Sequence, residues 1–157
     1  MRRRDGFTLI ELSIAVAIMM VILVLAIPSL RGVLADRQLR RSLNNVNRLV
    51  AQAQERSVAE RRSYLIVWRE KQFALRPEAF VQGEERKAVA TVNWEKNDVV
   101  TLTFPDAIDE APPSEWVFWP SGNCEPAVVT YRGTSGSWRA RYSALTGRPK
   151  ITDYAVR

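Results

Sequence analysis

The chain has 157 residues, of which 23 are Lys or Arg, 17 are Asp or Glu and none is His, which gives a formal net charge of +6. The length suits one domain with its own core, and an apolar content of 46% excludes general disorder. With no His and one Cys, the chain lacks His-based acid–base catalysis, a Cys–His nucleophile pair, an intramolecular disulfide and a Cys-rich zinc site.

The charge is unevenly distributed along the sequence. Residues 31–69 hold nine Arg against three acids, residues 70–116 hold ten acids against five basic residues, and residues 131–157 hold six basic residues against one acid. Basic ends around an acidic middle suggest electrostatic contacts with neighbouring proteins, although a solvated surface can segregate its charges in the same way.

The N-terminal segment joins a basic leader to an apolar run. Arg2–Arg4 precede the motif Gly6-Phe7-Thr8-Leu9-Ile10-Glu11, and the next sixteen residues contain only one polar side chain, Ser13. From Phe7 to Ile27 a helix would be about 31 Å long, enough to cross a hydrocarbon core. The basic leader predicts a cytoplasmic N-terminus and an exported remainder. Four arginines beyond the apolar run weaken this prediction, because by the same charge rule they favour the opposite orientation: Arg31, Arg37, Arg40 and Arg41.

Glu11 is the unusual residue of this segment, because a carboxylate inside a spanning helix is costly unless a cation meets it. One interpretation is a functional pairing. The other is that Glu11 lies at headgroup depth beside Arg2–Arg4 without a special role. Its position alone does not separate the two.

The leader, the motif and the apolar run together resemble the processing signal of type IV prepilins and type II secretion pseudopilins. The resemblance implies that a prepilin peptidase removes residues 1–6 by cutting after Gly6 and then N-methylates Phe7. It implies that Glu11 pairs with the new N-terminal amine of a neighbouring subunit during assembly. It also implies a transmembrane helix over 7–28, with Pro28 at a helix kink.

Beyond Pro28, the spacing predicts an amphipathic helix over 29–62. Apolar residues recur at steps of four and three and form one stripe, which we expect to pack on the protein's own sheet: Leu39, Leu43, Val46, Val50 and Ala53. The Arg-rich opposite face is either solvated or a filament contact to acidic neighbours.

From residue 63 to the C-terminus the pattern changes to short alternating strands separated by Gly-rich and Ser-rich turns, so we expect a β-rich globular domain over 63–157. The predicted strands are Tyr64–Arg69, Lys71–Arg76, Ala88–Trp94, Val99–Phe104, Trp116–Pro120, Ala127–Arg132, Ser137–Ser143 and, as an eighth, Lys150–Val156. One long helix followed by these strands predicts an α+β fold of pilin type, with the helix packed on an antiparallel sheet. Residues 105–114 are expected to form an exposed acidic loop.

Two later segments resemble the H-type minor pseudopilins (the GspH/FimT group): Val117–Gly122, with its Phe-x-Pro-x-Gly turn, and the late turn Leu145–Arg148. The last 27 residues contain one acid, too few for the calcium loop expected of a major pseudopilin. We predict a minor pseudopilin of a type II secretion system, an inner-membrane protein that crosses the membrane once, with its C-terminal domain in the periplasm. Its expected partners are prepilin peptidase, other major and minor pseudopilins, the inner-membrane secretion platform and membrane lipid.

The alternative function is that of a FimT-like minor pilin of a type IV pilus that binds DNA in natural transformation. Four basic residues near the C-terminus are the candidates for phosphate contacts: Arg139, Arg141, Arg148 and Lys150. No nucleophile motif such as GxSxG or SxxK occurs, so no enzymatic activity, cofactor or metal is expected. We expect Cys124 to be a buried thiol, with an intermolecular disulfide as the alternative, and the five Trp to belong to the core and sheet faces.

Overall fold

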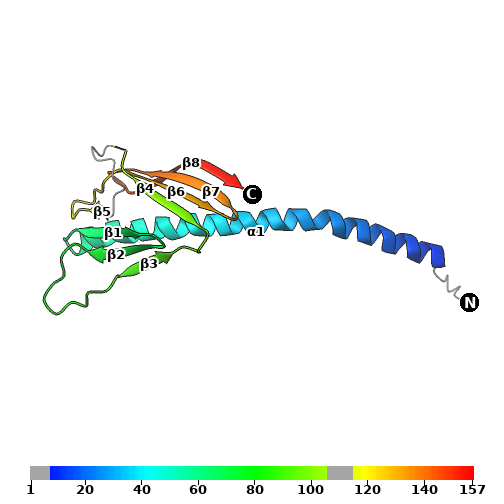
Figure 1. The fold of residues 1–157 in the computed structure, drawn as a ribbon, viewed down its shortest axis with the longest axis horizontal. Coiled ribbons are helices and arrows are strands. Elements are labelled where there is room, and N and C mark those ends of the chain that lie inside the picture. Colours follow the sequence, from blue (N-terminus) through cyan, green and yellow to red (C-terminus); the bar gives the residue numbers. More distant parts are fainter. Residues whose placement is uncertain (1–7, 106–114) are drawn as a thin grey trace, which may run out of the picture.

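In the computed structural model, which describes residues 8–105 and 115–157 and leaves the side chains of 24–31 undescribed, one helix runs along eight strands. The helix α1 extends over Leu9–Ala59, three residues short of the predicted end. Figure 1 shows its N-terminal half projecting beyond the strands and its C-terminal half lying against them. The acidic segment predicted over 105–114 lies almost entirely outside the described residues.

The strands form two antiparallel sheets of four strands each. The sheet β3-β2-β1-β5 consists of β1 (Tyr64–Arg69), β2 (Gln72–Pro77), β3 (Ala90–Asn93) and β5 (Glu115–Phe118). The sheet β4-β6-β7-β8 consists of β4 (Val99–Thr103), β6 (Ala127–Gly133), β7 (Gly136–Tyr142) and β8 (Pro149–Val156). The predicted α+β class and antiparallel pairing are confirmed, and the strands are divided between two sheets.

The division arises because β5 returns to the first sheet. After β4 of the second sheet the chain forms β5, which pairs with β1 of the first sheet through Ile66 and Trp116. It then forms β6, which pairs with β4 in the second sheet. The two sheets approach one another through aromatic side chains. Trp94, which follows β3, lies 5.6 Å from Phe73 and 5.9 Å from Tyr131, measured between ring centroids.

The core lies between α1 and the inner faces of the two sheets. The predicted apolar stripe of the helix is buried, with Leu39 and Ala53 fully enclosed, and Leu49 belongs to it as well. Burying each side chain of Val or Leu size stabilises the fold by about 1.5–3 kcal/mol. Of the five Trp, Trp116 and Trp138 are fully buried, whereas Trp119 is exposed. The C-terminal half of α1 is therefore part of the same core as the β-rich region.

Candidate functional site

The first turn of α1 includes Glu11, and Thr8 is its N-cap. The backbone of Thr8 is extended, and its Oγ1 accepts a 3.3 Å hydrogen bond from the backbone N–H of Glu11. The side chain of Thr8 thus satisfies one of the N–H groups that a helix start leaves without a partner, and the acidic side chain suits the positive end of the helix dipole. Gly6 and Phe7, the predicted cleavage and methylation residues, lie outside the described residues.

The cap at Thr8 was not among the features predicted from the sequence. The pattern Thr8-Leu9-Ile10-Glu11 has the Ser/Thr-x-x-Glu spacing of a helix N-terminus, and this spacing predicts the cap without any structure. The motif therefore begins the helix and also places the carboxylate one turn inside it. The assembly role of Glu11 stays a prediction.

The N-terminal half of α1 exposes apolar side chains on every side. Six consecutive residues from Ile18 to Leu23 are each more than half exposed, and Leu9 is 88% exposed. At 3.6 residues per turn, six consecutive residues cover the whole circumference of a helix. Within the described parts of the chain, no helix has a stretch that is both long and apolar enough to cross a membrane. The predicted span over 7–28 includes Phe7 and side chains after Leu23 that are not described, and it stays a prediction.

The helix α1 is continuous over Leu9–Ala59, a range that includes Pro28. Figure 1 shows that α1 curves gently. The side chain of Pro28 is among those not described, so the kink expected there stays a prediction.

The C-terminal half of α1 is held to the second sheet by hydrogen bonds between its polar residues and the aromatic side chains of the sheet. The indole Nε1 of Trp138 donates to Ser42 Oγ at 2.7 Å, and the hydroxyl of Tyr142 donates to Asn47 Oδ1 at the same distance. Nearer the N-terminus, the hydroxyl of Tyr154 donates to Asp36 Oδ1 at 2.7 Å. These bonds fix the angle at which the sheet lies on the helix.

Two of these contacts contain side chains whose pKa is shifted. Burial, followed by the hydrogen bond to Asp36, raises the pKa of Tyr154 to about 12. The same hydrogen bond and one from Arg40 lower the pKa of Asp36. Burial alone raises the pKa of Tyr142. The three groups keep their hydrogen-bonding protonation states at neutral pH, so the contacts persist there.

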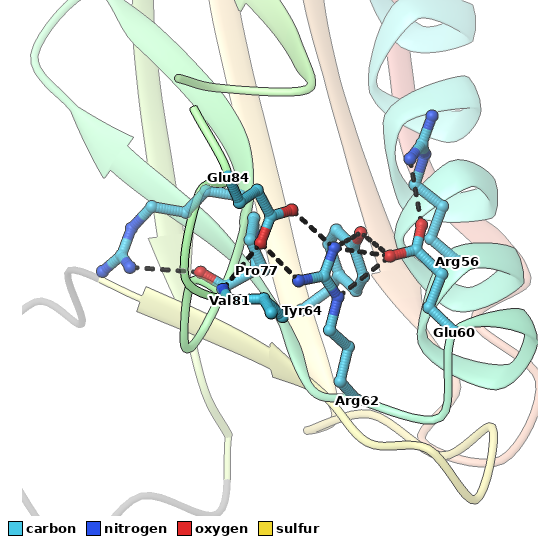
Figure 2. A network of polar contacts seen from close by, with 8 residues as sticks. Arg56, Glu60, Arg62, Tyr64, Pro77, Val81 and Glu84 are labelled. Carbon is cyan, nitrogen blue, oxygen red and sulfur yellow. Dashed lines mark hydrogen bonds and ion pairs between the residues drawn. The ribbon is translucent and has the colours of Figure 1, made fainter. Parts of the chain in front are cut away.

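A second polar network fastens the segment between β2 and β3 to the end of α1 (Figure 2). Both Nη atoms of Arg62 donate to the carboxylate of Glu84 at 2.7 Å, in a two-point contact. Glu60, just after the helix, accepts from Arg62 and from the hydroxyl of Tyr64. The hydrogen bonds from Arg62 lower the pKa of Glu84 to about 2. This network orders a loop at the end of the molecule that lies farthest from the N-terminus.

The outer face of the second sheet gathers most of the basic residues proposed for DNA contact. The alternation of β7 places Arg139 and Arg141 on this face, and the register places Lys150 of β8 opposite Arg141. Arg132 of β6 lies on the same face. We call these four residues the basic face: Arg132, Arg139, Arg141 and Lys150. Arg132, Arg139 and Arg141 line a hollow on this face. Arg148 lies in the turn before β8 and does not line that hollow.

Cys124 is a buried thiol, as the sequence analysis predicted. It is 2% exposed, and its Sγ lies 3.5 Å from the carbonyl oxygen of Ser143. Burial raises its pKa to about 11, so the unreactive thiol form prevails at neutral pH. In this fold Cys124 is not accessible to the thiol of another protein.

Comparisons with known proteins agree with this geometry. Residues 1–27 match the prokaryotic N-terminal methylation motif. The fold is similar to that of the type IV minor pilin FimU of Pseudomonas aeruginosa, at 12% identity and a TM-score of 0.54, over 75% of this chain and 90% of that one. It is equally similar to the minor pseudopilin EpsH of the Type 2 Secretion System of Vibrio cholerae, at 8% identity and a TM-score of 0.55, over 79% and 99% of the two chains. No curated protein matches the chain.

The chain therefore combines a prokaryotic N-terminal methylation motif over residues 1–27 with a pilin-like fold. The two solved structures with a similar fold are a type IV minor pilin and a minor pseudopilin.

Proposed function

We propose that the protein is a minor pseudopilin of a type II secretion system, a subunit that is assembled into a short periplasmic filament to drive protein export. Prepilin peptidase cuts after Gly6 on the cytoplasmic side of the inner membrane and methylates the amine of Phe7. The apolar helix over 7–28 keeps the mature chain in the membrane lipid, and the remainder of the chain lies in the periplasm. The inner-membrane secretion platform then transfers the chain into the filament.

The observation on which this proposal rests is the two-part character of α1. Its N-terminal half exposes apolar side chains around its whole circumference, whereas its C-terminal half is buried against two sheets and held by Ser42 and Asn47. An apolar surface of that extent needs a membrane or neighbouring subunits to cover it. A filament subunit uses both environments in turn, first the lipid and then the helices of its neighbours.

Glu11 has a defined part in this proposal. It is exposed, and its carboxylate forms no ion pair with the described residues of the isolated chain. A carboxylate among apolar side chains becomes favourable when a cation meets it. The amine of Phe7 in an adjacent subunit supplies that cation, so the pair sets the axial position of one subunit against the next.

The experiment that tests the proposal compares two glycine variants in a host with an active prepilin peptidase and secretion system. Gly6→Ala should leave the chain uncut and abolish its incorporation, because the processing signal that this segment resembles has its cut directly after the glycine. Gly32→Ala is the matched control, since among the described residues no contact beyond the chain neighbours and the helix backbone lies within 4 Å of an added Cβ. Intact-mass measurement and secretion of exported proteins are the two readouts. A wild-type chain that still begins at Met1 would refute the proposal.

A second candidate function is DNA binding by a FimT-like minor pilin of a type IV pilus in natural transformation. The basic face is the observation that favours it, because Arg139, Arg141 and Lys150 lie on one sheet face. Phosphate contacts would make duplex binding steeply salt-dependent, with a slope of about −0.9 per neutralised phosphate. Replacing Arg139, Arg141, Arg148 and Lys150 by Gln should then flatten that slope and reduce transformation while leaving secretion unchanged.

A further inference from the structure

The outer face of the second sheet carries paired residues from all four strands, with a register shift between β7 and β8 just after Arg139. The paired residues form three parallel rows across β4, β6, β7 and β8: Val99, Arg132, Ser137 and Ala155; Thr101, Thr130, Arg139 and Asp153; Thr103, Val128, Arg141 and Lys150. Residues paired across antiparallel strands point to the same face, so the twelve side chains share one surface. The surface holds four cations and one acid.

Part of the basic face lines a hollow of about 620 Å³, which Lys150 does not line. Arg132, Arg139 and Arg141 line the hollow together with the threonines of β4 and β6. Among the described residues, none of these three guanidinium groups forms an ion pair, and Asp153 does not bind Arg139 although it lies opposite. Three cations with free hydrogen-bond donors therefore face one hollow lined with hydroxyl groups.

The chemistry of this hollow favours carboxylates over nucleic acid. Proteins that bind single strands stack the bases on aromatic side chains, and the three rows contain none. Duplex binding gains its affinity from the number of phosphates that cations neutralise, and the four cations of this face can neutralise about four at most. Guanidinium groups bind carboxylates through two parallel hydrogen bonds, and threonine hydroxyls donate to the same oxygens.

The spacing of the cations matches an extended polypeptide. Arg139 and Arg141 are separated by one residue of a strand, so their Cα atoms lie about 6.8 Å apart. Acidic residues at alternate positions of another extended segment repeat at the same distance. Arg132 lies one strand away, diagonal to Arg139, and extends the contact across the sheet.

We infer that the basic face binds an acidic, extended segment of a neighbouring filament subunit. The inference rests on the proposed function, because it names the kind of contact by which this subunit is held beside another. The occupant presents carboxylates at alternate positions, and these replace the water that now solvates Arg132, Arg139 and Arg141.

The test measures binding of a labelled, end-blocked peptide of alternating Glu and Thr to the full chain in detergent micelles, by fluorescence anisotropy at about 150 mM salt. The array variant replaces Arg132, Arg139 and Arg141 by Gln. The control variant replaces Arg37, Arg69 and Arg86 by Gln, which removes the same charge from exposed positions on other elements. The array variant should bind roughly tenfold more weakly, and the control variant should be within about twofold of the wild type.

The comparison peptides and a duplex DNA separate the remaining explanations. The same peptide with Gln in place of Glu should not bind. Equal weakening in both variants would overturn the inference, because net charge alone would then explain binding. Binding of duplex DNA more tightly than the acidic peptide, and its loss in the array variant, would also overturn it in favour of a nucleic-acid surface.

The failure of this inference is distinguishable from failure of the proposed function. If the peptide does not bind while the chain is cut after Gly6 and enters the filament, only the docking inference is wrong. If the chain is never processed, the proposed function is wrong whatever peptide it binds. Near-ultraviolet circular dichroism reports on Trp138, which packs on the opposite face of β7, and shows whether the array variant is folded.

Discussion

The hydroxyl of Tyr142 donates a 2.7 Å hydrogen bond to Oδ1 of Asn47, and this bond joins the last residue of β7 to the middle of the buried half of α1. Tyr142 is fully buried and its ring lies 5.1 Å from that of Trp116 in the other sheet. One side chain thus contacts the helix and both sheets. Tyr142 therefore ties the buried half of the helix to both sheets.

Tyr142→Phe should destabilise the fold by about 1 kcal/mol, because the ring packing remains and only the hydrogen bond to Asn47 is lost. Urea unfolding of the full chain in micelles, followed by Trp fluorescence, measures the change. Tyr154→Phe is the comparison. It removes a bond to Asp36 at the partly exposed edge, so a smaller change is expected. Equal effects of the two variants would contradict the role assigned to Tyr142.

Gly136→Ala should destabilise the hairpin between β6 and β7 by about 2 kcal/mol or more. Gly136 has a φ of +137°, and an added Cβ would lie 2.1 Å from the carbonyl oxygen of Ala155 in β8. Because the clash is with backbone, a side-chain rotation cannot relieve it. The urea midpoint of the variant should fall, whereas Gly32→Ala, in open space on α1, should leave the midpoint unchanged or raise it slightly. An unchanged midpoint for Gly136→Ala would contradict the close approach of β8.

The contact between Arg62 and Glu84 should make stability depend on pH in the acidic range. The hydrogen bonds from Arg62 lower the pKa of Glu84 from 4.5 to about 2 in the folded chain. The contribution is fully present above the unfolded pKa and is lost as the pH falls through the folded one. The urea midpoint of the wild type should exceed that of Glu84→Gln at pH 6, and the difference should disappear near pH 2. A difference that is independent of pH would contradict the ionic nature of the contact.

Substitutions at Thr8 and Glu11 should separate the helix cap from the assembly charge. Thr8→Ala removes the acceptor for the Glu11 backbone N–H and should weaken the helix start by about 0.5–2 kcal/mol. Exchange of that amide in micelles, followed by NMR, should accelerate accordingly. Glu11→Gln keeps the backbone donor, so its amide should stay protected.

Incorporation into the filament should depend on the two residues in the opposite way from amide protection. Glu11→Gln, like Glu11→Ala, should reduce incorporation into the filament, because the pair with the amine of Phe7 is lost. Thr8→Ser keeps the hydroxyl and should be incorporated normally. Normal incorporation of Glu11→Gln would show that the carboxylate has no assembly role and that its place in the motif is explained by the helix start alone.

The local pattern of apolar and polar residues was sufficient to predict the helix and the strands of this fold. The alternation of apolar and polar residues predicted Tyr64–Arg69 with the bounds that β1 has, and placed β6 and β7 within one residue at each end. The stripe from Leu39 to Ala53 predicted the buried face of α1. The least accurate strand predictions were Ala88–Trp94 and Trp116–Pro120, because β3 pairs only over Ala90–Asn93 and β5 only over Glu115–Phe118.

Some features of the candidate sites follow from residue order, and others depend on the tertiary structure. The motif from Gly6 to Glu11 and its helix cap are contiguous in sequence, so residue order alone determines them. The division into two sheets, the contacts of Ser42 and Asn47 with the second sheet, the network around Arg62 and the rows of the basic face were decided only by tertiary structure. Each of these brings together residues that are far apart in the chain, such as Asn47 and Tyr142. The period of a strand determines which side chains share its face, but the neighbour of that strand depends on the packing of the whole core.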